Sequence, residues 1–359
     1  MIRIRQEVAS INPYIAGRTT AAVAAELGLE ESAIVKLASN EAPEGPFPGV
    51  AGAIAEAAAD ANRYPDNALR ELAALTASHH DIEPDNLWFA AGSSSTLREV
   101  ALAVGGPGSS SVFPDPSFVI YELATKLSGA TGRPVALDSD FRVDLDGLLS
   151  AIDATTTFVY VCNPNNPTGT VNATDDTRRF LDAVPDDVLV VVDEAYEEYV
   201  TDPGWQSMIP EAVRRPNVIV TRTFSKIFSL AALRVGYAVG MPATLADLRK
   251  AQAPFTVTTV AQAAAAASLK DPTELARRRA ANAAGRRGLE SGLADRSIAY
   301  VPSQANFVYL PMDDPGRLFA QFQQHGVITR STPGGLRVSV GAEAEMRQFF
   351  AVLDKLSLA

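Results

Sequence analysis

Polar residues that could do chemistry follow several of the apolar, strand-like runs of this 359-residue chain. The rigid loop 163–169, NPNNPTG, follows one run, Asp193 ends another, and Lys226 comes shortly after a third. After a fourth run, Gly92 precedes three serines that open a helical pattern. Because open α/β sheets bind ligands outside the carboxyl ends of their strands, these groups are predicted to gather at one site.

Each group also has an ordinary structural explanation. The turn after Gly92 could simply cap a helix, although amides at a helix N-terminus also bind phosphate. Asp193 could cap a turn, but a buried carboxylate normally has a cationic partner. Lys226 could extend to the surface, whereas an apolar pocket with a second cation would lower its pKa and make it nucleophilic toward aldehydes. Taken singly, none of these groups decides a function.

The combination is more specific than its parts. A phosphate-binding turn, a carboxylate, a reactive lysine and Arg234, eight residues after that lysine, suit one cofactor. Pyridoxal 5′-phosphate needs a lysine for its aldehyde, an anion at its ring nitrogen and a site for its phosphate. The carboxylate keeps the ring nitrogen protonated, so the ring can accept electrons when a bond to the substrate α-carbon breaks. The residues therefore predict pyridoxal phosphate chemistry.

A central sheet must position these groups. Continuous β-branched runs, instead of alternation, indicate strands that are buried on both faces and lie in a parallel sheet covered by helices. Such runs occupy residues 87–90, 111–113, 157–162, 188–193 and 217–223. Helical patterns lie between several of them, which favours an α/β fold with a central, mainly parallel sheet.

The sequence also predicts how the chain is divided. Residues 1–47, rich in Pro, Gly and Asn, are expected to form an N-terminal arm that contributes to a smaller domain. Residues 48–255 are expected to form the large α/β domain. Residues 256–359 are predicted to be a small α+β domain, because helix-rich sequence is followed by short strands and a helix from Glu343. These strands are predicted at 306–310, 327–329 and 336–340.

Composition excludes several classes of function. With 31 Lys+Arg and 42 Asp+Glu the net charge is −11, and the spread of this charge argues against nucleic acid and membrane partners. The lone Cys162 and three histidines leave little material for a disulfide or a metal site, so no metal is expected. The N-terminus lacks an apolar signal region, and no apolar run approaches the ~18 residues of a membrane span. A cytoplasmic location is therefore expected.

The chain resembles the histidinol-phosphate and aromatic aminotransferases among the fold-type I pyridoxal phosphate enzymes. The most specific segments are NPNNPTG (163–169), DEAY (193–196), RTFSK (222–226) and LRVGY (233–237), in that order. Further similar segments are LASNEAPEGPFP (37–48), NRYPDN (62–67), PDPSFVIY (114–121), PSQANFVYLP (302–311) and GGLRVSVG (334–341). The resemblance covers nearly the whole chain and implies the fold-type I architecture.

The resemblance also implies roles for single residues around the cofactor. Lys226 would be the Schiff-base lysine and the base that moves the proton, and Asp193 would pair with the ring nitrogen. The remaining contacts fall on the ring oxygen, the ring face and the phosphate. They would come from Asn166 and Tyr196 for the oxygen, from Phe118 for the face, and from Ser93, Ser94, Thr223, Ser225 and Arg234 for the phosphate.

Substrate and subunit contacts are implied in the same way. Arg337 would bind the α-carboxylate of the substrate with a bidentate fork. Asn40 and Tyr14 would line the substrate pocket. Tyr64 would come from the other subunit of a homodimer and reach the phosphate, so each site would need both chains. The arm at residues 1–47 would also contribute to the dimer contacts.

The expected reaction is transamination of an aromatic L-amino acid (phenylalanine, tyrosine or tryptophan) with a 2-oxo acid such as 2-oxoglutarate, with ping-pong kinetics. One alternative is the histidinol-phosphate aminotransferase reaction of histidine biosynthesis. It is weakened because GSSSTL (92–97) lacks the acidic pair usual in those enzymes. A second alternative is a related decarboxylase that acts on an amino-acid phosphate.

Overall fold

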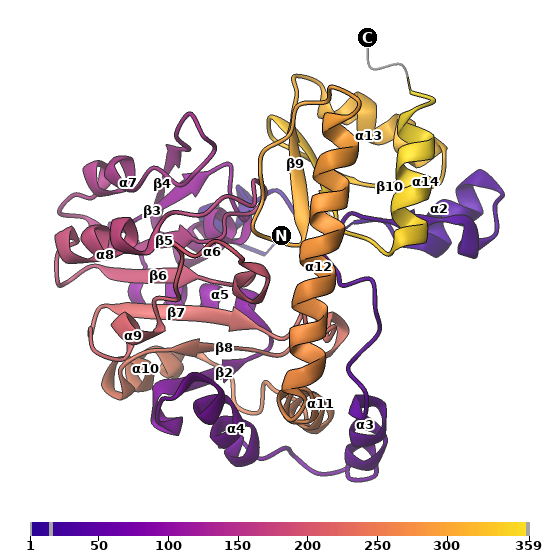
Figure 1. Cartoon of the computed structure of the whole chain (residues 1–359). Helices are drawn as coiled ribbons and strands as arrows, with labels where there is room; N and C mark the ends of the chain where they lie inside the picture. Colours follow the sequence, from indigo (N-terminus) through magenta and orange to yellow (C-terminus); the bar gives the residue numbers. More distant parts are fainter. Residues whose placement is uncertain (1, 14–16, 357–359) are drawn as a thin grey trace.

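The computed structural model describes residues 2–13 and 17–356. Within them a seven-stranded sheet forms the centre of the larger part of the molecule (Figure 1). Strands β3 to β7 run parallel, whereas β8 runs antiparallel to both of its neighbours. The predicted mainly parallel α/β sheet is confirmed. Its strand order is β2 (Leu87–Ala90), β8 (Gly236–Val239), β7 (Val218–Thr223), β6 (Leu189–Asp193), β5 (Thr156–Cys162), β3 (Ser110–Asp115) and β4 (Thr131–Ala136).

Two strands of this sheet, β8 and β4, have no predicted counterpart in the sequence. Strand β8 has only four residues, GYAV, and directly follows the loop that carries Arg234. Strand β4 reads TGRPVA and lies at the sheet edge, where Pro134 is tolerated because a neighbour on one side is absent. Both strands lack the long β-branched runs that mark the central strands.

Side chains of the central strands alternate between two apolar layers. In β6, Val190 and Val192 belong to one buried cluster, while Leu189 and Val191 belong to another. The two layers explain why these strands read as continuous apolar runs. The first cluster includes residues of helices α3 (Val50–Ala58), α4 (Arg70–His80), α7 (Leu145–Ala151), α8 (Thr174–Ala183) and α11 (Thr259–Leu269). The second includes residues of α5 (Ser93–Val104), α6 (Ile120–Ser128) and α10 (Pro242–Leu248).

A smaller body lies beside this sheet (Figure 1). It contains the antiparallel order β11 (Arg330–Thr332), β12 (Gly335–Ser339) and β9 (Phe307–Pro311), and a parallel pair, β1 (Val35–Lys36) with β10 (Val327–Ile328). Its helices are α2 (Thr20–Leu27), α13 (Pro315–Gln324) and α14 (Glu343–Leu353). The long helix α12 (Pro272–Ala294) runs from beside α11 up to this body (Figure 1).

Two packing observations bear on the predicted division of the chain. Ala261 and Ala264–Ala266 of α11 lie in the core of the large sheet, although they follow residue 255. Val35 and Leu37, from the N-terminal segment, lie in the core of the smaller body. The N-terminal segment thus contributes to that core, while the exact bounds at 47 and 255 stay predictions.

Three features bear on the expectations drawn from composition: the lone cysteine, the helices and the groups of possible metal ligands. Cys162 ends β5, is buried, and lies with its Sγ 3.4 Å from the carbonyl oxygen of Pro164. Burial raises the pKa of this thiol to about 12. In the described part of the chain, no helix has the length and apolar character that crossing a membrane requires. The same residues contain no group of three or more His, Cys, Asp or Glu side chains placed to hold a metal ion.

Candidate active site

A cavity of about 760 Å³ lies beyond the carboxyl ends of the central strands and reaches strand β12 of the smaller body. It brings together most of the side chains that the sequence analysis assigns to a site. They are Asn40, Ser93, Ser94, Phe118, Asn166, Asp193, Tyr196, Thr223, Ser225, Lys226, Arg234 and Arg337. A larger cavity, of about 940 Å³, lies between α12 and α14 and is lined by none of these residues.

Lys226 follows β7 and points its amine into the cavity wall. Its Nζ lies 3.4 Å from the carbonyl oxygen of Ser39 and 5.4 Å from the centre of the Tyr196 ring. Burial lowers the pKa of Lys226 to about 8, and the positive charge of Arg337 acts in the same direction. An amine in this environment is the nucleophile that the sequence analysis describes.

Asp193 is the last residue of β6 and is almost completely buried. Tyr121 donates a hydrogen bond to its Oδ2 at 2.8 Å, and Thr221 donates one to its Oδ1 at 3.0 Å. Burial raises the pKa of Asp193, and these two hydrogen bonds oppose the rise, as does the charge of Lys226. The cationic partner expected from the sequence is thus largely replaced by two hydroxyl groups.

Tyr121 and Thr221 are not among the residues predicted from the sequence. Tyr121 ends the motif PDPSFVIY, so its position could have drawn attention, but its partner could not be known. Thr221 is paired with Asp193 in the register of β6 and β7. Strand register is a tertiary property, so this contact has no signal in the local sequence.

The turn before α5 forms a place for an anion. Gly92 has φ +82°, a conformation that glycine adopts without strain, and α5 begins at the next residue. A side chain at this position would collide with the guanidinium of Arg234. Arg234 Nη1 donates to the carbonyl oxygen of Ala231 at 2.8 Å and to Ser225 Oγ at 3.4 Å. A helix N-terminus and a guanidinium therefore meet at one point, an arrangement that suits phosphate.

These residues fit pyridoxal 5′-phosphate. An amine with a lowered pKa, a buried carboxylate and an anion site open onto one cavity, and each corresponds to a different part of that cofactor. The side chains assigned to the ring, those of Phe118, Asn166 and Tyr196, line the same cavity. Their individual roles remain predictions.

Strand β12 carries Arg337 from the smaller body into the cavity. Arg337 Nη1 donates to Asn166 Oδ1 at 2.5 Å, and its Nη2 donates to the carbonyl oxygen of Ala38 at 2.6 Å. Asn40 Nδ2 donates to the hydroxyl of Tyr196 at 3.0 Å. The two residues assigned to the cofactor ring oxygen thus contact two residues assigned to the substrate. The structure joins the two parts of the site through direct hydrogen bonds.

Among the described residues, one assigned side chain does not line this cavity. Tyr64 is 83% exposed, and its ring stacks on Phe255 with the ring centres 4.7 Å apart. It does not line the cavity of its own chain, and its contact across a dimer stays a prediction. Tyr14 lies outside the described residues.

Comparison with known proteins gives the family. Residues 32–353 match the family described as aminotransferase class I and II. An aromatic amino acid aminotransferase from Thermobifida fusca is 41% identical over 355 residues, which are 97% of this chain and 96% of that protein. Histidinol-phosphate aminotransferase 2 from Pseudomonas aeruginosa is 39% identical over 355 residues, with the same two shares.

A solved structure supports the same conclusion. The crystal structure of histidinol-phosphate aminotransferase from Sinorhizobium meliloti in complex with pyridoxal-5'-phosphate is similar to this chain with a TM-score of 0.90 and 28% identity. The similarity covers 99% of this chain and 97% of that one. Together with the lysine, carboxylate and anion site at one cavity, this match confirms the fold-type I architecture. The chain therefore belongs to the class I and II aminotransferase family.

Proposed function

We propose that the chain catalyses pyridoxal phosphate-dependent transamination of an aromatic L-amino acid with a 2-oxo acid such as 2-oxoglutarate. The observation that carries this proposal is the mixed character of the cavity. Apolar side chains of Phe118, Val119, Leu123 and Pro333 line it together with the guanidinium of Arg337. A flat apolar side chain and an α-carboxylate would each find a matching surface there.

When bound, the cofactor supplies an electron sink for the pair left on the substrate α-carbon. Lys226 then serves as the base, because an amine with a pKa near 8 takes up and returns a proton close to neutral pH. The Asp193 carboxylate, oriented by Tyr121 and Thr221, would keep a proton on the ring nitrogen. Each residue thus holds or moves a proton at a defined position.

Arg337 is prepared for a carboxylate. Both of its terminal nitrogens already donate hydrogen bonds, to Asn166 and to Ala38, so the planar fork is held in one orientation. Binding of an α-carboxylate would therefore cost little side-chain entropy. Asn40 would complete this wall through its contact with Tyr196.

The proposed enzyme is a homodimer in which Tyr64 of one subunit reaches the phosphate site of the other. Its support is the exposed ring pair of Tyr64 and Phe255, since large exposed aromatic side chains are enriched at protein interfaces. Light scattering should give twice the mass of one chain. Tyr64→Phe should weaken pyridoxal phosphate binding in that dimer, and a fully active monomer would contradict the proposal.

Histidinol phosphate is the second candidate substrate. Lys126 and Arg330 line the same cavity as Arg337, and a group of cations suits a phosphate. Relatives with both activities in their names match to similar extents, so the names favour neither substrate. The decarboxylase alternative has less support, because the relatives named above are aminotransferases.

The deciding experiment compares kcat/KM for phenylalanine, tyrosine, tryptophan and histidinol phosphate, each with 2-oxoglutarate as acceptor. We expect the best aromatic substrate to exceed histidinol phosphate by at least about tenfold, which corresponds to about 1.4 kcal/mol in transition-state binding. The reverse order would replace the aromatic assignment by the histidinol-phosphate one. Release of carbon dioxide without a 2-oxo acid product would support the decarboxylase.

Two variants test the assigned residues. Lys226→Ala should abolish turnover and the visible absorbance of the lysine-bound cofactor, and retained activity would overturn the mechanism. Arg337→Ala should raise KM at least about tenfold and leave the cofactor bound, because a charge-assisted bidentate contact is lost. Loss of cofactor from the Arg337 variant would contradict its assignment to the substrate.

A further inference from the structure

A second group of charged side chains lies directly behind the site. Arg222, in β7, is 2% exposed and has its guanidinium fully occupied. Its Nε donates to Glu194 Oε2 at 3.0 Å, its Nη1 donates to Glu197 Oε2 at 2.5 Å, and its Nη2 donates to Ser207 Oγ at 3.0 Å. None of these residues lines the proposed active-site cavity.

The alternation of the strands connects this group to the site. Successive side chains of a strand point to opposite faces, so Asp193 and Glu194 face opposite ways, as do Thr221 and Arg222. Thr221 donates to Asp193 on the cavity face, while Arg222 donates to Glu194 on the other face. The ends of β6 and β7 are thus joined twice, once on each side of the sheet.

Glu194 and Arg222 are each held by more than one contact. Glu194 also accepts hydrogen bonds from the Met208 amide and the Ser207 hydroxyl, both at 2.7 Å. Burial, together with the charge of Glu197, raises the pKa of neighbouring Glu198 to about 8, so Glu198 is protonated at neutral pH. The guanidinium of Arg222 holds the Glu194 and Glu197 carboxyl groups in a fixed geometry, and its charge opposes the rise that burial causes in the pKa of Glu194.

Burying such a group yields little stability relative to an apolar core, since the cost of desolvation offsets the attraction. The group instead fixes the geometry of the strand ends. Asp193 is adjacent to Glu194, and Lys226 is four residues after Arg222, so a shift between the two strand ends would move carboxylate and amine relative to each other. The charges that shift the pKa of Lys226 are those of Arg337, Glu41, Arg234 and Asp193, which lie on the cavity side.

We propose that Arg222 is a positioning residue, which ties the ends of β6 and β7 together through Glu194 and Glu197 and so fixes Asp193 relative to Lys226. The proposal rests on the assignment of these two residues to pyridoxal phosphate. It concerns a residue that touches neither cofactor nor substrate, and its effect must therefore appear in how the cofactor is held.

The test compares three variants of the full-length enzyme: Arg222→Met, Arg222→Lys and the control Arg286→Met. Arg286 is also buried, at 4% exposure, but it donates to the carbonyl oxygens of Tyr199 and Ala305 and to Thr201 Oγ1, and none of these is a hydrogen-bond partner of Arg222. For each variant we would measure the Kd for pyridoxal phosphate by titrating the apo-protein, the pH midpoint of the cofactor's visible absorbance, and stability in urea.

Arg222→Met should raise the Kd for pyridoxal phosphate at least tenfold. It should also move the pH midpoint of the visible absorbance upward by at least half a pH unit, because a displaced Asp193 would stabilise the protonated ring nitrogen less. Arg222→Lys should fall between wild type and Arg222→Met, because one ammonium group cannot hold both carboxylates in one plane. Arg286→Met should lose stability but keep the Kd for pyridoxal phosphate within twofold of wild type and the absorbance midpoint within 0.1 pH unit.

Suppose that Arg222→Met and Arg286→Met lose similar stability and have the same Kd and the same absorbance midpoint. Arg222 would then have only a structural role. If Arg222→Met does not fold, Glu197→Gln decides, because it removes one ion pair of a side chain that is 20% exposed. A threefold weaker Kd would support the proposal, and an unchanged Kd would overturn it. Failure of the wild type to bind the cofactor would instead refute the proposed function itself.

Discussion

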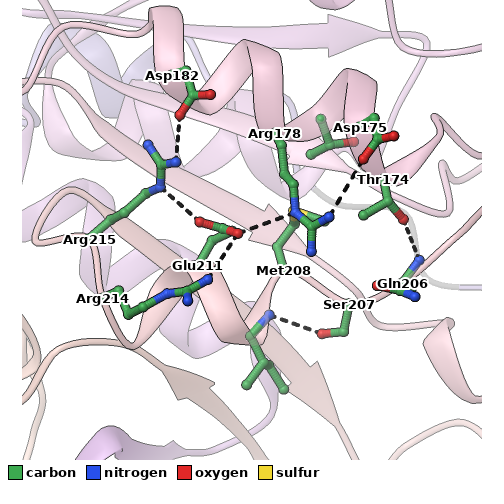
Figure 2. A network of polar contacts seen from close by, with 12 residues as sticks. Thr174, Asp175, Arg178, Asp182, Gln206, Ser207, Met208, Glu211, Arg214 and Arg215 are labelled. Atoms are coloured by element: carbon green, nitrogen blue, oxygen red, sulfur yellow. Dashed lines mark hydrogen bonds and ion pairs between the residues drawn. The ribbon is translucent and has the colours of Figure 1, made fainter.

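Two charged networks of the larger part of the molecule are centred on opposite charges. In the first, the single guanidinium of Arg222 lies among three carboxyl groups, those of Glu194, Glu197 and Glu198. In the second, the single carboxylate of Glu211 lies among three guanidiniums (Figure 2). These belong to Arg178, Arg214 and Arg215, of which Arg178 also pairs with Asp175 and Arg215 with Asp182. The segment Ser207–Met208, which contacts Glu194, leads directly into α9 (Ile209–Ala212), which carries Glu211.

The networks differ in burial, and this difference separates their roles. The side chains of Arg222 and Glu194 are 2% and 1% exposed, whereas those of Arg178 and Arg214 are 37% and 66% exposed. An exposed guanidinium that loses its partner can turn to water, but a buried one cannot. Loss of Glu211, whose own side chain is only 10% exposed, leaves arginines that can reach water, whereas loss of Arg222 leaves the buried Glu194 without its cation.

Removing the central residue of each network should show the largest contrast. Arg222→Met leaves buried carboxylates without their cation and should lower the free energy of unfolding by about 3–5 kcal/mol. Glu211→Met leaves arginines that can reach solvent and should cost about 1 kcal/mol. Urea denaturation of both variants at pH 7 measures the difference. Equal losses would mean that burial does not separate the two networks.

Glu198 offers a way to test the buried network through pH. Its pKa is raised to about 8, first by burial and then by the charge of Glu197. In the unfolded chain this carboxyl loses its proton near its ordinary pKa, so wild-type stability should fall as pH rises from about 4.5 to about 8. Glu198→Gln removes this titration. Its stability relative to wild type should rise over the same range and gain on the order of a few kcal/mol by pH 9.

The control for this experiment is the same variant at pH 4, where wild-type Glu198 is protonated in both states and the difference should be smallest. Unfolding in urea at pH 4, 6, 8 and 9 gives the required series. A difference that stays constant across the series would show that Glu198 titrates normally in the folded protein.

The residues at the ends of β6 and β7 that face the cavity could be predicted from the sequence better than those on the opposite face of the sheet. Asp193 and Lys226 follow long β-branched runs, and parallel strands bring the ends of such runs to one edge. Tyr121 and Thr221 were missed because they act through strand register and helix packing. The role of Arg222 was also invisible: it stands within RTFSK, but the face it occupies depends on where β7 begins and ends.

The same reasoning explains which parts of the fold escaped prediction. Helices α5 and α12 have clear starts, after Gly92 and at Asp271, whose side chain accepts a hydrogen bond from the Glu274 amide at 2.9 Å. Strand β8 has no such signal, since its four residues become a strand only by pairing with β7 and β2. Local apolar runs therefore predicted the strands that carry them, and tertiary contacts decided β4 and β8, which have no such run.

At the exposed network the pH dependence should have the opposite sign. Burial alone would raise the pKa of Glu211, but the hydrogen bond from Arg215 and the charges of Arg214, Arg215 and Arg178 outweigh it, so the pKa lies below its usual value. A carboxyl with a lowered pKa stabilises the fold above its ordinary pKa and loses this effect as pH falls. Glu211→Gln should therefore cost about 1 kcal/mol at pH 7 and almost nothing at pH 3. A cost that grows toward low pH would reverse the assigned sign.

The smallest effect is expected at the outermost member of this network. Arg214 forms an i,i+3 ion pair with Glu211, with Nη2 3.2 Å from Oε1, and the Arg214 side chain is 66% exposed. Arg214→Ala should lower the free energy of unfolding by no more than about 0.5 kcal/mol, and 1 M NaCl should abolish the difference, since the Debye length then falls to about 3 Å. Arg222→Lys should keep most of its deficit in the same salt, because solvent ions do not reach a buried pair. If salt erased both deficits equally, the buried network would be accessible to ions, and its proposed role in fixing the strand ends would lose its physical basis.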